Sequence, residues 1–446
     1  MNETKYPEAF LKRMRSILND EYDAFMNCLA LPSPTSIRLN PAKRISKFDN
    51  EEQVPWCNEG KYLTERPSFT FDPLFHAGAY YVQEASSMFV EQAWKQINPK
   101  NQPVRVLDMC AAPGGKSTHL LSLMSSDCLL VTNELIPNRN KILQQNVIKW
   151  GYSNCIITQN KPEDFAALGN YFDIILVDAP CSGEGLFRKD KDAVDEWSEK
   201  NVELCAIRQK GILQDALSCL KPGGFIIYGT CTYESSENDE QLEELLVAGL
   251  PAGQAGCQLT VNTDTPGLVK TKYGVQFFPH KIKGEGFYLA VFQKEGGPLV
   301  HRAPLTEKQK TANAESDFLQ NPDAFIQFKK NDLIFSIPKF MQADFAMLER
   351  NLYIRNAGIF MGTTKGKDFL PSHDLALSNE VNTNLPSIEL DYDQAITYLR
   401  SESIKADTTI RGWCLVKYQN LNLGWIKVMD GRSNNYFPKD WRILKK

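Results

Sequence analysis

Two cysteines lie where their thiols can take part in chemistry. Cys181 comes shortly after the apolar run 172–177, and Cys231 follows the apolar run 225–228. Each run is typical of a buried parallel strand, and the carboxyl ends of such strands form the ligand crevice of an open α/β sheet. Because a thiolate is a strong nucleophile, two thiols at one sheet edge favour paired nucleophilic chemistry. The alternative for either thiol alone is packing, since cysteine is among the most buried residue types.

A loop of small residues stands between the apolar run 104–107 and the start of a predicted helix. Its seven members are Cys110, Ala111, Ala112, Pro113, Gly114, Gly115 and Lys116. Such a loop lets a nucleotide or a cofactor lie against the backbone at a helix N-terminus. It resembles the P-loop of ATPases, but Cys110 stands where a P-loop needs glycine, and Pro113 lacks an N–H that a phosphate would use. A P-loop ATPase is therefore the alternative to be weighed.

Glu134 helps to distinguish a triphosphate ligand such as ATP from an adenosyl ligand without a triphosphate. It lies just after the next apolar run, 129–132. A carboxylate at this strand end hydrogen-bonds ribose hydroxyls in Rossmann-type sites, and a P-loop has no use for it. An adenosyl ligand without a triphosphate therefore fits the loop and Glu134 better than ATP does.

The two thiols and Asp178, which directly follows the run 172–177, suit alkylation of a pyrimidine ring at C5. That carbon is barely nucleophilic until another nucleophile adds at C6, and a thiolate suits this addition. Asp178 is placed to stabilise the charge that develops near N3 of a cytosine. A second polar group then assists elimination of the attacking thiol. The residues themselves leave open which cysteine attacks.

Three segments together resemble the signature motifs of the Fmu/Sun family of RNA (cytosine-C5) methyltransferases. They are CAAPGGK at 110–116, DAPCSGEG at 178–185 and GTCT at 229–232. The whole architecture is similar to the RsmF-like branch, which acts on small-subunit ribosomal RNA, and a transfer RNA substrate stays open as the alternative. The resemblance implies a Rossmann-like class I methyltransferase domain with a mixed seven-stranded sheet.

The resemblance also implies S-adenosyl-L-methionine as the cofactor. The loop 110–116 is then expected to bind it, with Glu134 on the ribose and Asp178 near the methyl group and the cytosine. Asn160 is the expected contact to the adenine, and Asp164 is the competing choice for that contact.

In this family the Thr-Cys thiol is the nucleophile and the Pro-Cys thiol serves product release. Cys231 is therefore expected to attack C6, and Cys181 to assist release of the enzyme. A catalytically silent RNA-binding assembly factor would be expected to lack one thiol or Asp178, and all three residues are present.

The order of apolar and amphipathic segments predicts an α/β chain with flanking domains. From Val104 to Lys294 short apolar runs alternate with longer amphipathic segments, which is typical of βαβ units, and two late strands suggest an antiparallel edge. We expect four regions: an N-terminal α+β RNA-binding domain at 1–97, the methyltransferase domain at 98–294, a polar linker at 295–317, and a C-terminal RNA-binding region at 318–446. The last is expected to end in a small PUA-like β domain, because its alternating pattern and Asp-Gly turn indicate antiparallel strands.

The composition is that of an ordinary intracellular protein. The chain has 446 residues, of which 42% are hydrophobic, and a formal net charge of −4. Its 11 cysteines are odd in number and lack zinc spacing, so we expect reduced thiols and no metal. No run approaches the roughly 18 apolar residues of a membrane span. We expect a cytoplasmic, monomeric enzyme whose partner is RNA, either small-subunit rRNA or the 30S subunit, with no membrane association.

Several residues are candidates for contacts with the RNA. Arg188 and Lys189 could hold phosphate beside Cys181, although a solvated turn is an equal alternative. Aromatic side chains near the C-terminus could stack on bases, and some of them belong to the core instead; these are Trp413, Trp425, Tyr436 and Trp441. The N-terminal region carries a cluster of basic residues, either an RNA-contacting face or an ordinary solvated one; they are Lys12, Arg13, Arg15, Arg38, Lys43 and Arg44.

Overall fold

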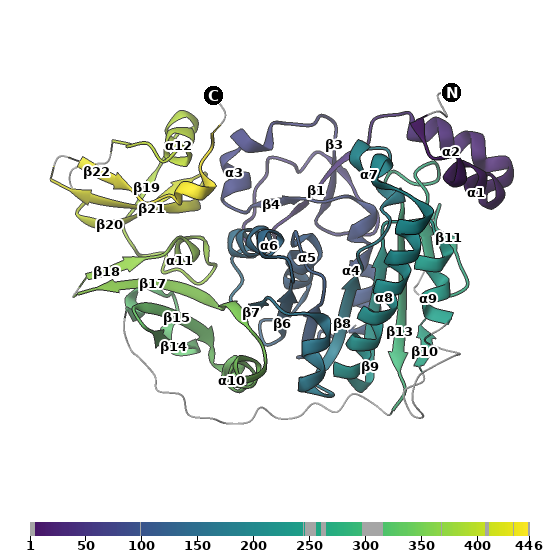
Figure 1. Cartoon of the computed structure of the whole chain (residues 1–446). Helices are drawn as coiled ribbons and strands as arrows, with labels where there is room; N and C mark the ends of the chain where they lie inside the picture. Colours follow the sequence, from purple (N-terminus) through teal and green to yellow (C-terminus); the bar gives the residue numbers. More distant parts are fainter. Residues whose placement is uncertain are drawn as a thin grey trace.

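The computed structural model describes residues 5–98, 100–243, 245, 256–259, 265–296, 315–366, 368–405, 410–430 and 432–444. Most of the predicted linker, residues 297–314, lies outside the described part of the chain. Figure 1 shows the chain as a row of packed units, with the C-terminal sheets at one side and helices α1 and α2 at the other.

A large mixed sheet forms the centre of the molecule. Its order is β11-β12-β13-β9-β8-β5-β6-β7-β16, and β10 also pairs with β13. Strands β5 to β9 are parallel to their neighbours among themselves, and β13 runs antiparallel to β9. The seven expected strands are β5 (Arg105–Asp108), β6 (Leu129–Asn133), β7 (Cys155–Thr158), β8 (Phe172–Asp178), β9 (Leu220–Thr230), β12 (Gly274–Phe277) and β13 (Phe287–Lys294). The predicted mixed α/β sheet is confirmed.

Three further strands extend this sheet beyond the expected seven. They are β10 (Gly256–Leu259), β11 (Val269–Lys270) and β16 (Ile354–Ala357). Strand β16 comes from the C-terminal region and pairs antiparallel with β7. It is only four residues long and includes Arg355 and Asn356, so it has no apolar periodicity from which a strand could be predicted.

Strand β9 also begins earlier than expected. The apolar run in the sequence starts at residue 225, whereas the structure begins β9 at Leu220, which pairs with Phe172. Phe172 pairs with Leu220 and Ile174 with Phe225, so residues 221–224, which include the Pro-Gly-Gly segment, form an irregularity within β9.

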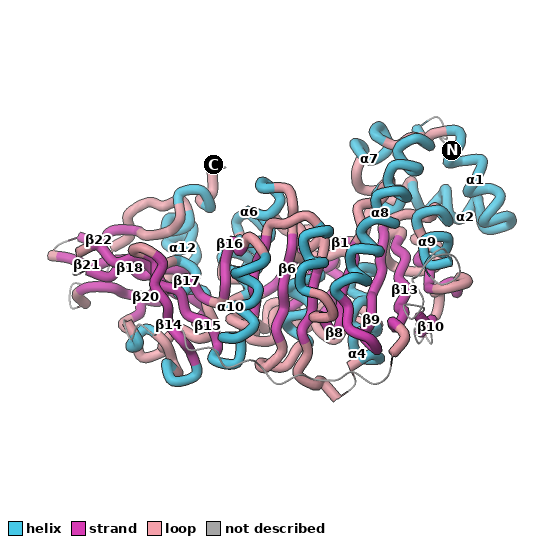
Figure 2. The backbone as a smooth tube through the Cα atoms, turned by 60° about the horizontal axis from the view of Figure 1, so that its bottom comes forward, coloured by secondary structure: helices cyan, strands magenta, loops and turns pink. Residues whose placement is uncertain are grey.

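Helices cover both faces of the central sheet. Adjacent residues of β5 point to opposite faces, so Val106 packs in one core and Leu107 in the other. The first core includes side chains of α4 (Val90–Ile97), α5 (Gly115–Leu123) and α6 (Pro137–Trp150). The second includes side chains of α8 (Glu199–Cys219) and α10 (Gln342–Asn351), which lie over the same face in Figure 2. The central sheet is thus flanked by helices on both faces.

The N-terminal region combines helices with a small antiparallel sheet. The sheet has the order β2-β3-β1-β4, built from β1 (Thr35–Leu39), β2 (Glu52–Gln53), β3 (Gly60–Leu63) and β4 (Tyr80–Val82). The short helix α3 (Pro73–His76) precedes β4. Helices α1 (Glu8–Leu18) and α2 (Tyr22–Leu29) pack instead against Phe187 and Tyr233 of the central domain. The expected α+β character is present.

The C-terminal region contains two four-stranded sheets. One has the order β14-β15-β17-β18, with β14 (Phe325–Lys330), β15 (Leu333–Pro338), β17 (Ile359–Lys365) and β18 (Asp368–Pro371). The other contains β19 (Ser387–Glu389), β20 (Gly412–Tyr418), β21 (Leu421–Met429) and β22 (Arg432–Asn435), with α11 (His373–Leu377) and α12 (Tyr392–Leu399) nearby in sequence. Among the described residues, no helix combines the length and the apolar composition needed to cross a bilayer.

Candidate active site

The structure brings the two thiols together at the carboxyl edge of the central sheet. Strands β8 and β9 are parallel neighbours in which Asp178 pairs with Gly229, so the residues that follow emerge side by side. The sulfur atoms of Cys181 and Cys231 lie 2.9 Å apart, and the Cys231 N–H donates to the Cys181 sulfur at 3.2 Å. Both residues are partly exposed. A ligand at this edge can therefore reach either sulfur.

The two cysteines differ in their electrostatic environment. The hydrogen bond with Cys231, together with burial, raises the pKa of Cys181 well above its usual value. The Cys181 thiol therefore favours its protonated form.

Buried carboxylates hold the loop that carries Cys181. Glu237 accepts a hydrogen bond from the Ser182 N–H at 2.9 Å. Glu184, which is fully buried, forms an ion pair with Arg13 of α1. Arg13 and Glu184 are 171 residues apart in sequence, so no local pattern could have predicted this pairing. The N-terminal helices thus help to position the loop that carries Cys181.

Asp178 lies beside these thiols and is paired with the last residue of the glycine-rich loop. Its carboxylate is 2.8 Å from Lys116 Nζ, and its side chain remains one-third exposed. Although burial alone would lower it, the nearby Asp178 carboxylate raises the pKa of Lys116. The ammonium also lies 5.0 Å from the centre of the Phe287 ring. Lys116 therefore stays charged and keeps Asp178 in place at the cleft.

The glycine-rich loop lies between β5 and α5, as predicted. Its course is set partly by the Ala111 N–H, which donates to the Asn133 carbonyl at 2.9 Å. Gly114 has φ +108°, a conformation that glycine adopts without strain. A Cβ on Gly115 would lie 3.3 Å from the Tyr81 ring, so a larger residue would crowd this turn. These features leave backbone rather than side chains facing a bound ligand.

Asp108, the residue at the end of β5, offers a test of whether the loop suits a cationic ligand. Its side chain is fully buried, and its Oδ2 accepts a hydrogen bond from Ser117 Oγ at 2.6 Å. Its Oδ1 is buried without a partner in the described part of the chain. Burial raises the pKa of Asp108 to about 7. An unpartnered acidic oxygen at this point fits a positively charged group, such as the amino group of S-adenosylmethionine.

Glu134 follows β6 at the same edge, one strand further along. Its Oε1 accepts a hydrogen bond from the Ile136 N–H at 2.8 Å, and its Oε2 lies 3.4 Å from Arg139. The side chain is only 5% exposed. The carboxylate is thus held in one orientation and retains acceptor capacity for a diol.

Asn160 follows β7, but its side chain is already engaged by the C-terminal region. Its Nδ2 donates to the Tyr353 carbonyl at 3.1 Å, and its Oδ1 accepts from the Tyr353 N–H at 2.9 Å. One amide hydrogen remains for a ligand. The competing candidate, Asp164, accepts from the Lys161 N–H at the start of its own short helix. The role of either residue toward adenine stays a prediction.

Several expected RNA contacts do not fit the structure. Arg188 is only 4% exposed and pairs with Glu285 at 2.9 Å, so the prediction that it holds phosphate was wrong. Arg38 is fully buried and Lys43 is 8% exposed, so neither belongs to a basic surface. Trp425 is 1% exposed and belongs to the core. Sequence alone could not exclude these residues, because tertiary partners far along the chain bury them.

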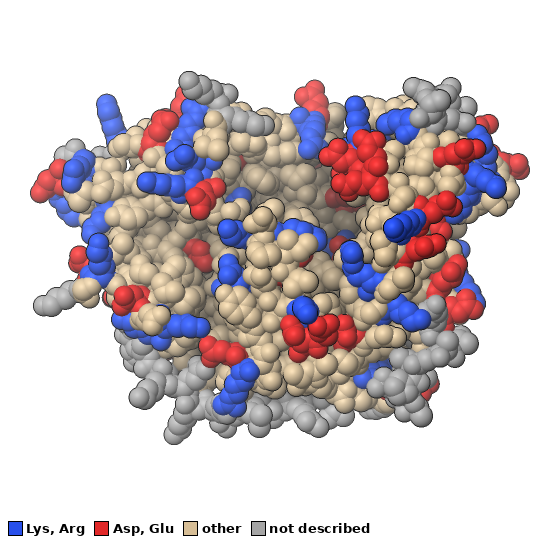
Figure 3. Space-filling model, in the orientation of Figure 1, with Lys and Arg blue, Asp and Glu red and all other residues tan. Residues whose placement is uncertain are grey.

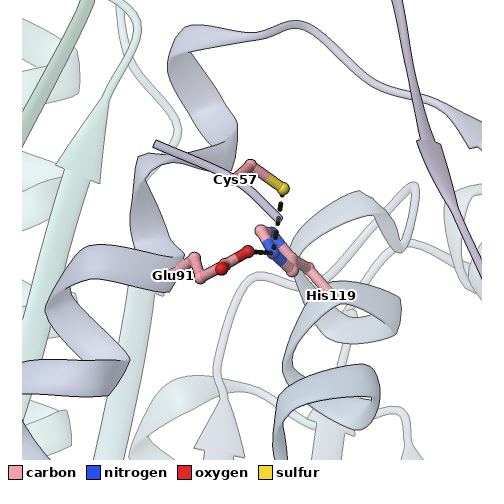
Figure 4. A group of neighbouring side chains, drawn as sticks. All are labelled: Cys57, Glu91 and His119. Atoms are coloured by element: carbon pink, nitrogen blue, oxygen red, sulfur yellow. Dashed lines mark hydrogen bonds and ion pairs between the residues drawn. The ribbon is translucent and has the colours of Figure 1, made fainter. Parts of the chain in front are cut away.

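A second group of chemistry-bearing residues lies away from the cleft. Cys57, Glu91 and His119 form a buried cluster in which Glu91 accepts from His119 Nε2 at 3.1 Å (Figure 4). Lys95 also pairs with Glu91 at 2.6 Å. Although burial alone would raise it, these hydrogen bonds lower the pKa of Glu91 to about 2. The carboxylate is thus already neutralised by a cation from its own helix, and the cluster joins the N-terminal region to α5.

Charged side chains are interspersed on the face of the molecule drawn in Figure 3. Lysines, arginines and acidic residues are mixed over this face, several basic side chains lie near its centre, and the hollow above them is lined largely by uncharged residues. This pattern agrees with the net charge of −4. A nucleic acid on this face would be held at separate basic points rather than by one continuous field.

Comparisons with known proteins agree with this geometry. Three family models match in order: the N-terminal domain of 16S rRNA methyltransferase RsmF at residues 6–85, 16S rRNA methyltransferase RsmB/F at 95–293, and the methyltransferase RsmF PUA domain at 385–443. A ribosomal RNA small subunit methyltransferase F of Salmonella heidelberg is 30% identical over 478 residues, covering 98% of this chain and 96% of its own. The chain belongs to the RsmF family of methyltransferases.

Other relatives support this placement. The protein of the same name from Erwinia tasmaniensis is 28% identical and covers 98% of this chain and 96% of its own. A solved methyltransferase homolog from Pyrococcus horikoshii has a TM-score of 0.54 and 27% identity, over 65% of this chain and 95% of its own. Membership in the RsmF family confirms the predicted Rossmann-like methyltransferase domain and the C-terminal PUA domain, and it favours methyl transfer over the ATPase alternative.

Proposed function

We propose that this methyltransferase modifies cytosine at C5 in small-subunit ribosomal RNA, with S-adenosylmethionine as the methyl donor. It acts as a cytoplasmic monomer, on rRNA alone or within the 30S subunit. The observation that carries the proposal is the pair of sulfurs 2.9 Å apart, next to Asp178 at the ligand edge of the sheet. Two thiols and a carboxylate are the groups that C5 alkylation requires.

The cofactor is held by residues that already fit its chemistry. The loop 110–116 would lie against the methionine moiety, the unpartnered Oδ1 of Asp108 would face its positive charge, and Glu134 would bind the ribose. S-adenosylmethionine supplies a methyl group on a sulfonium centre, which is a good electrophile.

Cys231 is the nucleophile in the proposed reaction. Its thiolate forms a bond to C6 of the cytosine, and the electrons of the C5–C6 double bond then make C5 nucleophilic. C5 would take the methyl group from the sulfonium donor, whose S–CH3 bond breaks so that S-adenosylhomocysteine leaves. Loss of the C5 proton to a base then lets the electron pair re-form the C5–C6 double bond as the sulfur leaves C6. The Cys231 thiolate is thereby regenerated.

Cys181 assists the release step. Its sulfur lies 2.9 Å from that of Cys231, and its raised pKa favours the thiol form, so it is placed to donate a hydrogen bond to the departing Cys231 thiolate. Asp178 lies at the same edge, where it can stabilise charge on the ring, and Lys116 fixes its position at 2.8 Å. The environment of Cys181 therefore supports the order of roles that family resemblance implies.

Single-cysteine variants test the proposal. Cys181→Ala and Cys231→Ala are incubated with small-subunit rRNA and S-adenosylmethionine, and the products are examined on a denaturing gel and as digested nucleosides. We expect Cys181→Ala to accumulate a denaturation-resistant protein–RNA adduct, and Cys231→Ala to form neither adduct nor 5-methylcytidine. The matched control is Cys128→Ala, a buried cysteine that precedes β6 and thus lies at the opposite edge of the sheet.

The outcomes separate the parts of the proposal. The reverse pattern would refute the assignment of roles but not the reaction. Methylation of a different base or position by the native enzyme would refute the cytosine-C5 proposal. A parallel reaction with transfer RNA tests the substrate, since preferential methylation of transfer RNA would contradict the choice of ribosomal RNA.

A further inference from the structure

Strand β16 brings a residue of the C-terminal region to the ligand edge of the methyltransferase sheet. Because β16 runs antiparallel to β7, with Ile354 paired to Thr158, its beginning lies at the carboxyl end of β7. The residue just before β16 is Tyr353, whose carbonyl accepts from the Gln159 N–H at 3.0 Å and from Asn160 Nδ2 at 3.1 Å. Its N–H donates to Asn160 Oδ1 at 2.9 Å. Three hydrogen bonds thus fix the Tyr353 backbone at this edge.

The order of the strands sets the direction in which the cofactor must lie. Along this edge the strands lie in the order β9, β8, β5, β6, β7 and β16. The two cysteines and Asp178 follow β9 and β8, the glycine-rich loop follows β5, and Glu134 follows β6. With the methyl group near the cysteines and the ribose at Glu134, the adenine must extend toward β7 and β16. Tyr353 stands at that far end, two strand spacings or about 10 Å beyond β6.

Apolar surface left open at this end also indicates a ligand. Leu135 and Ile136, directly after Glu134, are 47% and 48% exposed, and Tyr353 is 59% exposed. Arg355 donates to the Tyr353 hydroxyl at 3.3 Å, and its guanidinium lies 5.9 Å from the centre of the ring, which holds the phenol while the residue stays 59% exposed. Exposed apolar groups along a ligand edge are typical of a binding site.

We propose that Tyr353 forms the outer wall of the adenine pocket, so that the C-terminal region completes the cofactor site of the methyltransferase domain. The inference rests on the proposed cofactor. The aromatic ring packs against the adenine, while Asn160 holds the Tyr353 backbone in position. Cofactor binding and the docking of β16 on β7 therefore stabilise each other, since each orders surface that the other contacts.

Binding of S-adenosylhomocysteine, measured by titration calorimetry without RNA, tests this contact. We expect Tyr353→Ala to weaken the affinity about five- to tenfold, the size of one lost aromatic contact. Tyr353→Phe keeps the ring and should stay within about twofold of the native protein. The control is Tyr392→Ala, a tyrosine of α12 that is 49% exposed. The melting temperature of Tyr353→Ala should change little, because an exposed ring is removed while the backbone hydrogen bonds remain.

A second measurement does not depend on any variant. Hydrogen exchange of the amides of Tyr353 and of β16 should slow when S-adenosylhomocysteine binds the native protein. Unchanged affinity of a folded Tyr353→Ala, or unchanged exchange at β16, would overturn the inference. Failure of the native protein to bind S-adenosylhomocysteine would refute the proposed cofactor instead, so the two failures are distinguishable.

Discussion

Replacement of Arg38 by methionine should weaken the attachment of the N-terminal region to α5, the helix that follows the glycine-rich loop. Arg38 lies on β1, is fully buried, and carries its charge without a carboxylate partner in the described part of the chain. Its guanidinium donates to Thr118 Oγ1 at 2.7 Å and to Gln83 Oε1 at 2.9 Å. A longer bond reaches the Gly115 carbonyl at 3.3 Å, and the guanidinium lies 4.4 Å from the centre of the Trp150 ring.

The magnitude follows from these contacts. Hydrogen bonds to a charged group contribute about 1.5–3 kcal/mol each, and a desolvated cation–π contact about 2 kcal/mol. Recovery of the hydration of the buried charge offsets part of this sum. We expect Arg38→Met to lower the free energy of unfolding by about 3–5 kcal/mol. For a domain of about 200 residues this lowers the melting temperature by about 10 °C. Arg38→Lys keeps the positive charge but loses the planar guanidinium, so its melting temperature should lie between those of the native protein and Arg38→Met.

Calorimetric melting and S-adenosylhomocysteine binding provide the assay. Arg38→Met should melt early and bind the ligand more weakly, because the first turn of α5 loses its support. The matched control is Arg66→Met, an exposed arginine whose guanidinium also lies over an aromatic ring, that of Phe69 at 5.4 Å. This control should melt within about 2 °C of the native protein. A melting temperature of Arg38→Met equal to that of the control would refute the reasoning.

Two other predictions concern the cleft. Asp108 has a pKa of about 7, and the cationic amino group of the ligand needs its ionised form, so the affinity for S-adenosylhomocysteine should fall up to tenfold per pH unit below pH 7. Asp108→Asn should remove this pH dependence. A pH dependence that persists in the variant would contradict the role of Asp108. Gly185→Ala should abolish methylation and adduct formation, because the new Cβ would lie 2.2 Å from the Gly286 carbonyl and displace the loop beside the cysteines. Gly211→Ala, where the Cβ meets open space, is its control, and an active Gly185→Ala would show that the loop adapts.

The sign of the Asp108 effect on folding is opposite to that of most carboxylates. Its pKa in the folded protein lies above the ordinary value of 3.8, so folding favours the protonated form. Its contribution to stability is therefore present at low pH and is lost as the pH rises from about 4 to 7. A bound cation at Oδ1 would reverse this loss.

Much of the catalytic edge could be predicted from the sequence by itself. Buried parallel strands are continuous apolar runs, and functional residues follow their carboxyl ends, so local patterns located Cys181, Cys231 and Glu134 on one edge. The glycine-rich loop is likewise a local signal, because its conformation depends on the types of adjacent residues. Family resemblance then added the methyl donor and the roles of the two thiols.

The tertiary structure alone decided the features that depend on partners distant in the chain. Arg38 and Arg188 have the same local signal as solvated arginines, and only packing shows that they are buried. The pairing of β16 with β7 joins segments almost 200 residues apart, and its four residues carry no periodicity. Hydrophobic periodicity records which face of an element is buried, but not which element covers it. For that reason the sequence located the sheet edge on which the candidate site residues lie, and the fold determined that the C-terminal region reaches it.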